Sequence, residues 1–168
     1  KQGRHAEYAD LAARFFDHVF VHSDPTLIPF GATFSEAEGI AQLIRYTGYV
    51  VEYRGVSVYF GGDTGYTRAF RETRERFTEL DLVILPIAPI HPRWFMCRNH
   101  TDPDEALRAF ADLGARYLLA THYDTFVNSL DEYGEAPRVL RALLPRYGLD
   151  ERRVAVLAHG EQRIFIRR

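Results

Sequence analysis

The chain has 168 residues, enough for one domain with a substantial core, and its composition is that of an ordinary globular protein. A formal net charge of −2 without any basic run argues against a nucleic-acid-binding surface. Cys97 is the only cysteine, which excludes an intrachain disulfide and a cysteine-based zinc cluster, and no apolar stretch is long enough to cross a bilayer.

An amphipathic helix is predicted over residues 6–20, where apolar side chains recur at helical spacing. Its polar face is poor in Lys and Arg, which favours packing on a core over binding at a membrane surface. His18 and His22 lie four residues apart near its end, but two histidines are too few for a closed zinc site. Residues 25–48 are predicted to be irregular or weakly helical, with a short helix starting near Ser35.

A β-hairpin precedes the first candidate site residue. Residues 49–53 and 56–60 are predicted strands, joined by the tight turn Arg54-Gly55. Gly61-Gly62 then lets the backbone bend and presents Asp63 at the carboxyl end of the second strand. A carboxylate in this position can hold a metal or a positive substrate group, and it can equally bond its own backbone within the turn.

The rest of the chain alternates between predicted helices and strands, which implies a layered α/β domain. The apolar run at 81–87 is typical of a strand buried on both faces. The loop at 88–99 is rich in aromatic residues and either packs down or walls a pocket. Helices are predicted over 68–77, 102–113 and 136–147, and strands over 81–87, 116–121, 154–157 and 163–166.

The clearest local signal is the start of the helix after residue 101. Asp102 suits the N-cap, Pro103 the first turn and Glu105 a capping box, while Gly114 marks the end of the helix. His100 therefore sits just outside a helix N-terminus. The helix field disfavours protonating an imidazole there, which fits a neutral histidine beside a phosphate.

His122 stands at the carboxyl end of the strand predicted over 116–121. A lone histidine in such a place is more often structural than a ligand. Because Asp63 follows a similar strand, and open α/β sheets collect their ligands at strand carboxyl ends, we expect the two residues at one site.

Four motifs together resemble one family in their order and spacing. They are similar to the carboxyl-terminal half of metallo-β-lactamase-fold hydrolases, and most of all to the N-acyl-phosphatidylethanolamine phospholipase D-like branch. The resemblance implies an αββα sandwich with a mixed sheet flanked by helices. It assigns 33–168 to the carboxyl-terminal half of that domain and leaves 1–32 as a helical segment outside it. The motifs are Phe60-Gly61-Gly62-Asp63-Thr64-Gly65-Tyr66, Pro92-Arg93-Trp94-Phe95-Met96, His100-Thr101-Asp102-Pro103-Asp104-Glu105-Ala106 and His159-Gly160-Glu161.

The resemblance also implies a dinuclear zinc centre that activates a water for attack on a phosphodiester or related ester bond. By position, Asp63 matches the carboxylate that bridges the two metals, and His122 matches the last metal-binding histidine. His100 matches a pocket histidine near the substrate phosphate and, with Asp63, is the catalytic candidate. Three further candidates for substrate binding are Tyr66, Arg93 and Trp94.

Two features depart from the family pattern. Nothing in this sequence matches the family's His-x-His-x-Asp-His motif, and Thr33 stands where an upstream metal histidine is expected. Asp63 and His122 alone cannot complete a catalytic zinc site. The chain opens with Lys1 rather than Met, as a fragment or processed product would. Three interpretations stay open: a zinc hydrolase to which this chain supplies half of the metal site, a degenerate non-catalytic module, and a lactonase-like or nuclease-like member of the fold.

The expected partners follow from the same resemblance. One is the substrate, a small-molecule or lipid phosphodiester. The other is a protein segment that packs on the apolar strand faces, either the missing half of the sandwich or a second chain, as in a homo-oligomer. Nothing resembles a signal peptide or a transmembrane segment, so we expect a cytoplasmic protein, with a location peripheral to the membrane implied only by the phospholipase resemblance.

Overall fold

The computed structural model describes residues 2–16, 19–21, 34–42, 44–46, 49–127 and 129–166. The chain divides into two compact units, Lys1–Gly48 and Tyr49–Arg168. The boundary predicted between residues 32 and 33 remains a prediction. His18, His22 and Thr33, discussed above as ligand positions, lie outside the described residues.

The first unit contains one helix and a short parallel strand pair. Helix α1 confirms the predicted helix, although its apolar side chains Tyr8, Leu11 and Phe15 stay largely exposed, so packing on a core is not seen among the described residues. The helix ends before residue 20, because β1 overlaps the end of the stretch predicted to be helical, while β2 lies in the stretch predicted to be irregular. Each strand is only three residues long. The elements are α1 (Gln2–Phe15), β1 (Val19–Val21), the 3₁₀ helix η2 (Glu38–Ile40) and β2 (Ile44–Tyr46), with β1 pairing in parallel with β2.

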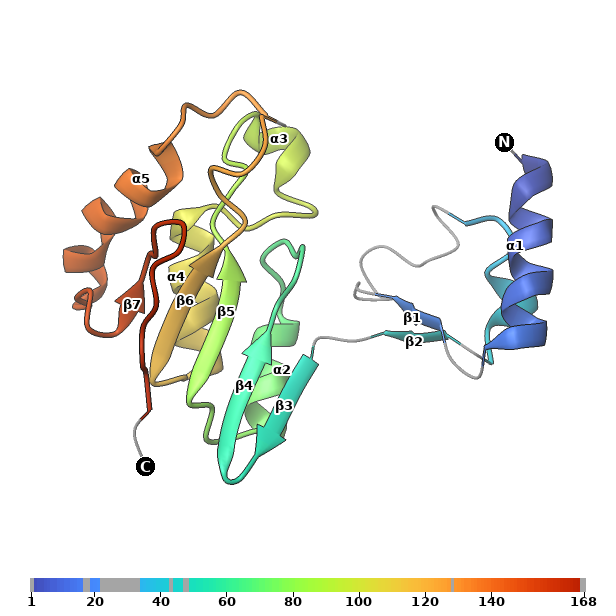
Figure 1. The fold of residues 1–168 in the computed structure, drawn as a ribbon, viewed down its shortest axis with the longest axis horizontal. Coiled ribbons are helices and arrows are strands. Elements are labelled where there is room, and N and C mark those ends of the chain that lie inside the picture. Colours follow the sequence, from blue (N-terminus) through green and yellow to red (C-terminus); the bar gives the residue numbers. More distant parts are fainter. Residues whose placement is uncertain are drawn as a thin grey trace. The chain divides into compact units, whose positions relative to one another are not determined.

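The second unit is built on a five-stranded mixed sheet with the strand order β3-β4-β5-β6-β7 (Figure 1). Strands β3 and β4 form the predicted hairpin, and both turn residues, Arg54 and Gly55, have positive φ as a tight primed turn requires. The other neighbouring pairs are parallel. The strands are β3 (Tyr49–Tyr53), β4 (Val56–Phe60), β5 (Leu82–Pro86), β6 (Tyr117–Thr121) and β7 (Val154–Ala155).

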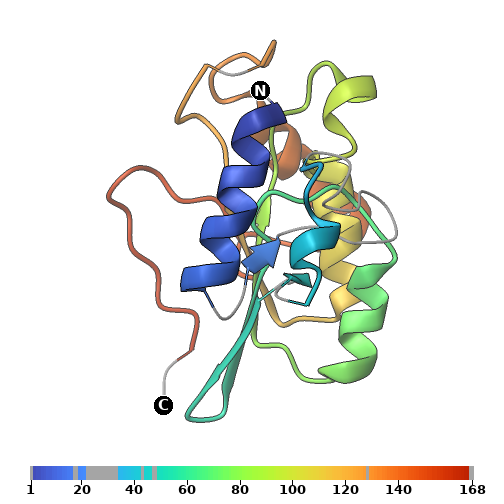
Figure 2. The same ribbon diagram turned by 90° about the vertical axis from the view of Figure 1, so that its right-hand side faces the viewer.

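Three helices cover one face of this sheet (Figures 1 and 2). Helix α4 begins as predicted: the Glu105 backbone N–H donates to Asp102 Oδ1 over 2.9 Å, and the Glu105 carboxylate accepts from the Asp102 N–H. It ends at Gly114, whose φ of 65° is the left-handed conformation of a C-cap. The helices are α2 (Ala69–Arg76), α4 (Pro103–Leu113) and α5 (Glu135–Leu143), with short α3 (Arg93–Met96) in the predicted loop and the 3₁₀ helix η3 (Leu144–Tyr147) after α5.

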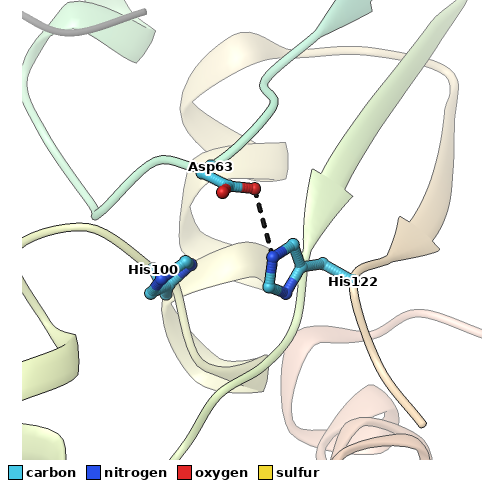
Figure 3. A group of neighbouring side chains, drawn as sticks. All are labelled: Asp63, His100 and His122. Carbon is cyan, nitrogen blue, oxygen red and sulfur yellow. Dashed lines mark ion pairs between the residues drawn. The ribbon is translucent and has the colours of Figure 1, made fainter. Parts of the chain in front are cut away.

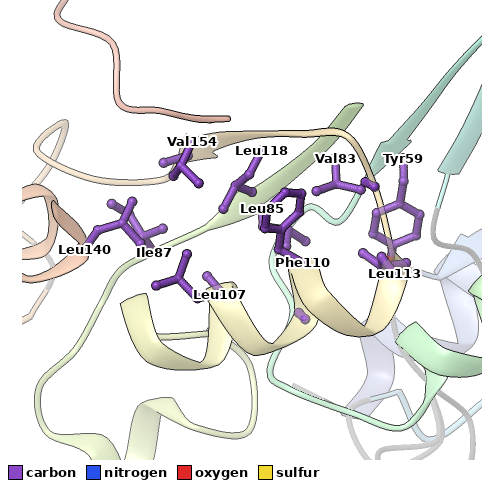
Figure 4. Packing of buried hydrophobic residues seen from close by; sticks show 14 of the residues in the cluster. Tyr59, Val83, Leu85, Ile87, Leu107, Phe110, Leu113, Leu118, Leu140 and Val154 are labelled. Carbon is purple, nitrogen blue, oxygen red and sulfur yellow. The ribbon is translucent and has the colours of Figure 1, made fainter. Parts of the chain in front are cut away.

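The core lies between the sheet and α4 (Figure 4). Val83 and Leu85 are two residues apart on β5 and both face the helices. Phe110 and Leu113 of α4 belong to the same core cluster, and all four side chains are at most 2% exposed. Burying side chains of this size contributes about 1.5–3 kcal/mol each. This packing holds the sheet rigid beneath the residues that follow its strands.

The opposite face of the sheet is also apolar but only partly buried. Val58, Leu82 and Tyr117 pair across β4, β5 and β6 and so share this face. Their exposure corrects the prediction of a β5 strand buried on both faces, since Leu82 is only half-buried. At the edge of the sheet, Val51 and Phe60 are 58% and 43% exposed.

The prediction of a strand over residues 163–166 is wrong. Residues 163–166 have no regular structure, and within this segment Arg163 donates to the Arg152 carbonyl while the Phe165 ring contacts Tyr117. The alternating side chains of this segment are explained by these individual contacts rather than by strand pairing.

Candidate metal centre

The parallel strands β4, β5 and β6 end at one edge of the sheet, where two candidate ligands meet. The Gly61 N–H donates to the Ile84 carbonyl over 2.9 Å, which extends the ladder one residue past β4 before the chain turns toward Asp63. His122 directly follows β6, and its Nε2 lies 3.2 Å from Asp63 Oδ1 (Figure 3). The expectation that these two residues share a site is matched by the geometry.

His122 has an unusual backbone conformation for a histidine, with φ of 61°. A non-glycine residue in this left-handed region costs about 1–3 kcal/mol and persists only where its surroundings impose it, and such residues gather at functional sites. The conformation directs the chain away from β6 while the imidazole stays beside Asp63.

His100 reaches the same point from the segment that leads into α4. The centroid of its ring lies 4.9 Å from that of His122 (Figure 3). The neighbouring Thr101, which is fully buried, fixes this segment: its N–H donates to the Thr64 carbonyl and its hydroxyl to the Pro86 carbonyl, each over 2.7 Å. Thr101 therefore joins the Asp63 loop, the end of β5 and His100, a role that the sequence pattern did not indicate.

One donor atom from each of Asp63, His100 and His122 lies within 4.8 Å of the other two. Burial lowers the pKa of His100, and the neighbouring His122 lowers it further, while Asp63 partly opposes them. His100 Nδ1 is buried without a hydrogen-bond partner among the described residues. The His122 imidazole and the Asp63 carboxylate are donor types that suit Zn²⁺ or a similar divalent ion, and the free nitrogen of the neutral His100 ring lies beside them, where it can contact a group bound to that ion. The residues present therefore fit a metal.

Arg93 is held inside the protein rather than presented to solvent. Its guanidinium donates to the Pro89 and His100 carbonyls and to Glu105 Oε2, the last over 3.0 Å. These contacts tie α3 and the start of α4 to the backbone of His100. The geometry supports a positioning role for Arg93, and its predicted role in substrate binding stays a prediction.

The other two substrate-binding candidates make separate sets of contacts. The Tyr66 hydroxyl donates to Asp112 of α4, and the Arg108 guanidinium stacks over the Tyr66 ring at 4.3 Å. Trp94 of α3 is 79% exposed and contacts Phe95. None of the described contacts joins Tyr66 or Trp94 to the three metal-binding candidates.

A pocket of about 430 Å³ adjoins His122. It is formed mainly by the loop between β6 and α5, and Ala88 is its one lining residue from the aromatic loop at 88–99. The sequence pattern gave no sign of it, since the loop combines polar and apolar residues without periodicity. The lining residues are Ala88, His122, Tyr123, Asp124, Thr125, Phe126, Val127, Ser129, Asp131, Glu132, Tyr133 and Ala136.

His91, Asp131 and Glu135 form a second group of metal-type side chains. In this group the carboxylates are already hydrogen-bonded to the backbone. The two Asp131 oxygens accept from the backbone N–H groups of Ile90 and His91, each over 2.7 Å. Glu135 accepts from the Glu132 N–H and pairs with His91. The group is explained as a tie between the loop after β5 and the loop after β6.

Comparison with known proteins identifies the family of the chain. The sequence model of the β-lactamase superfamily domain matches residues 18–123, more than half of the chain. A solved metallo hydrolase from the archaeon Ignicoccus hospitalis superposes with a TM-score of 0.52 at 25% identity, over 68% of this chain and 43% of that one.

Several curated relatives share part of the sequence. An N-acyl-phosphatidylethanolamine-hydrolyzing phospholipase D of Caenorhabditis elegans is 34% identical over 94 residues, covering 55% of this chain and 26% of the nematode protein. The mitochondrial yeast protein of the same description is 34% identical over 60% of this chain and 22% of its own length. A metal-dependent hydrolase of Pelotomaculum thermopropionicum is 32% identical over 68% of this chain and 46% of its own length. The chain thus spans less than half the length of these relatives.

Proposed function

The chain belongs to the metallo-β-lactamase-fold hydrolases, in the branch similar to N-acyl-phosphatidylethanolamine phospholipase D, and on this premise we propose that it acts in the metal-dependent hydrolysis of a phosphodiester or related ester. In this proposal the chain supplies one half of a zinc site. The substrate is a small-molecule or lipid phosphodiester.

The observation that carries the proposal is the convergence of Asp63, His100 and His122 at the carboxyl edge of the sheet. When bound, a divalent ion such as Zn²⁺ polarises the scissile group and lowers the pKa of a coordinated water. Asp63 and His122 would hold the ion. His100 would face the phosphate, where its neutral ring orients an oxygen by a hydrogen bond or, once protonated, donates to the leaving oxygen.

We also propose that the apolar second face of the sheet packs on the other sheet of the sandwich. Val51, Tyr53 and Phe60 are too exposed and too apolar to favour contact with water. Size-exclusion chromatography with light scattering tests this: a monomer that gains no partner and binds no hydrophobic dye at this face would contradict it.

Hydrolysis of bis(p-nitrophenyl) phosphate by the zinc-loaded protein tests the proposed activity. Asp63→Ala is expected to abolish turnover with little effect on folding, because the Asp63 side chain is 64% exposed. Asp150→Asn, on the turn before β7, is the matched control and should keep full turnover. Unchanged turnover in Asp63→Ala would contradict the proposal, and a folded wild type that binds zinc without turnover would favour a non-catalytic module.

A further inference from the structure

The pocket beside His122 is placed to receive a second part of the substrate. Its loop leaves the sheet at His122 and returns at α5, and His122 itself lines the pocket. Its volume of about 430 Å³ lies within the range typical of small-molecule sites. If the proposed function holds, a group bound here belongs to the same molecule as the scissile bond.

The pocket is negatively charged. Asp124, Asp131 and Glu132 line it, and no Lys or Arg is among its described lining residues. Two of these carboxylates are fixed by the backbone: Asp124 Oδ1 accepts from the Gly134 N–H over 2.8 Å, and Asp131 accepts from two N–H groups. The Glu132 carboxylate forms one described ion pair, in which its Oε2 lies 3.7 Å from Nη2 of Arg138, a residue outside the pocket lining. Such a lining repels anions and attracts cations.

The remaining walls are aromatic and apolar. Phe126 and Tyr133 are 82% and 80% exposed, while the small residues Ala88 and Ala136 are buried and leave room at the base. Aromatic rings together with carboxylates are the surroundings that bind an organic ammonium group, through cation–π contact and charge attraction. An apolar acyl chain would not explain the Glu132 carboxylate, whose only described partner is Arg138, and the three carboxylates would repel a second phosphate.

We propose that this pocket binds a cationic ammonium group, carried on a short carbon chain next to the phosphodiester that the metal site cleaves. The proposal deepens the proposed function and rests on it for the position of the scissile bond. The preferred substrate would then be zwitterionic at this end. Its phosphate would lie toward His122 and His100, and its ammonium group toward Asp124 and Glu132.

Two esters that differ by one charge test the proposal. p-Nitrophenyl phosphocholine and p-nitrophenyl 3,3-dimethylbutyl phosphate have nearly the same shape, and only the first carries a cation. We expect kcat/KM to favour the cationic ester by about tenfold or more, the scale of an exposed cation–π and charge contact. Equal or reversed kcat/KM values would overturn the proposal.

Variants locate the effect. Asp124→Asn removes one charge while Asn tolerates the φ of 55° and still accepts from Gly134, so the loop is preserved. Both Asp124→Asn and Glu132→Gln should reduce the preference for the cationic ester several-fold. Glu151→Gln, which breaks an exposed ion pair with Arg141 outside the pocket, should leave it unchanged. A preference unaltered in both pocket variants would overturn the assignment.

Binding separates this proposal from the hydrolase proposal. Choline and its neutral isostere 3,3-dimethyl-1-butanol can be titrated into the protein by NMR without turnover. Tighter binding of choline that weakens in Asp124→Asn supports the pocket even if bis(p-nitrophenyl) phosphate is not cleaved. Cleavage of that ester with no preference for choline overturns the pocket proposal and leaves the hydrolase proposal standing.

Discussion

His122 Nε2 and Asp63 Oδ1 lie 3.2 Å apart although the two residues follow strands that are separated in the sheet by β5. The parallel register of β4, β5 and β6 brings their carboxyl ends to one edge, and the Thr101 contacts add His100 to the pair. The site is thus assembled by the sheet, and its parts can be tested one at a time.

His100→Ala is expected to lower turnover by about 10²–10⁴, the contribution of a general acid or base, while zinc content stays intact. The reason is that His100 is assigned to the substrate phosphate and Asp63 and His122 to the metal. Zinc content and kcat are measured on the same preparation, with exposed His159→Ala as the control. Loss of zinc in His100→Ala would show instead that His100 is itself a ligand.

Arg93→Met should lower the free energy of unfolding by about 1–3 kcal/mol. Burial raises the pKa of Glu105 and Arg93 partly offsets this, so the variant leaves a half-buried carboxylate and the His100 carbonyl without their donor. Urea unfolding measures the effect, with Arg68→Met, an exposed partner of Glu72, as the control. A raised KM with unchanged stability would instead favour the substrate-binding role predicted for Arg93.

Gly65→Ala should disturb the site through the backbone. A Cβ at this position would lie 2.5 Å from the Cys97 carbonyl oxygen and 2.7 Å from that of Arg98. The Asp63 loop and the segment before His100 would have to separate, so we expect a loss of about 1–3 kcal/mol and lower zinc affinity. Thermal unfolding and zinc titration measure both effects. Gly39→Ala, where a Cβ meets nothing within 4 Å, is the control, and equal behaviour of the two variants would refute the close approach.

Stability should fall in alkaline solution because of Tyr59. Burial raises the pKa of Tyr59 from 10.0 to about 12, so the folded protein holds this proton more tightly than the unfolded chain. The resulting contribution, on the order of 2–3 kcal/mol, is fully present below pH 10 and is lost between pH 10 and pH 12. Tyr59→Phe should flatten the fall in unfolding free energy over this range. A wild-type slope that persists in the variant would assign the effect to other groups.

The sequence predicted the second unit well where local rules decide the structure. The capping box at Asp102, the Gly114 stop and the Arg54-Gly55 turn are each determined by residues a few positions apart, and all are confirmed. The meeting of Asp63 and His122 was predictable because parallel strands align their carboxyl ends.

The remaining features depend on contacts between distant residues. The three-residue strands β1 and β2 exist through pairing with each other and carry no pattern of their own. The three contacts that hold Arg93 beside His100 run from α3 to Pro89, His100 and Glu105, and no helix or strand periodicity encodes them. The pocket beside His122 arises from the course of one irregular loop. Such features follow from the folded structure and not from periodicity.

The most direct test of the metal site is the zinc content of the chain, measured by elemental analysis after purification without chelators and equilibration with zinc. We predict that the wild type binds zinc and that Asp63→Ala and His122→Ala each lose most of it, with folding retained. Absence of zinc from the wild type, or equal zinc in all three proteins, would contradict the assignment of Asp63 and His122 as ligands.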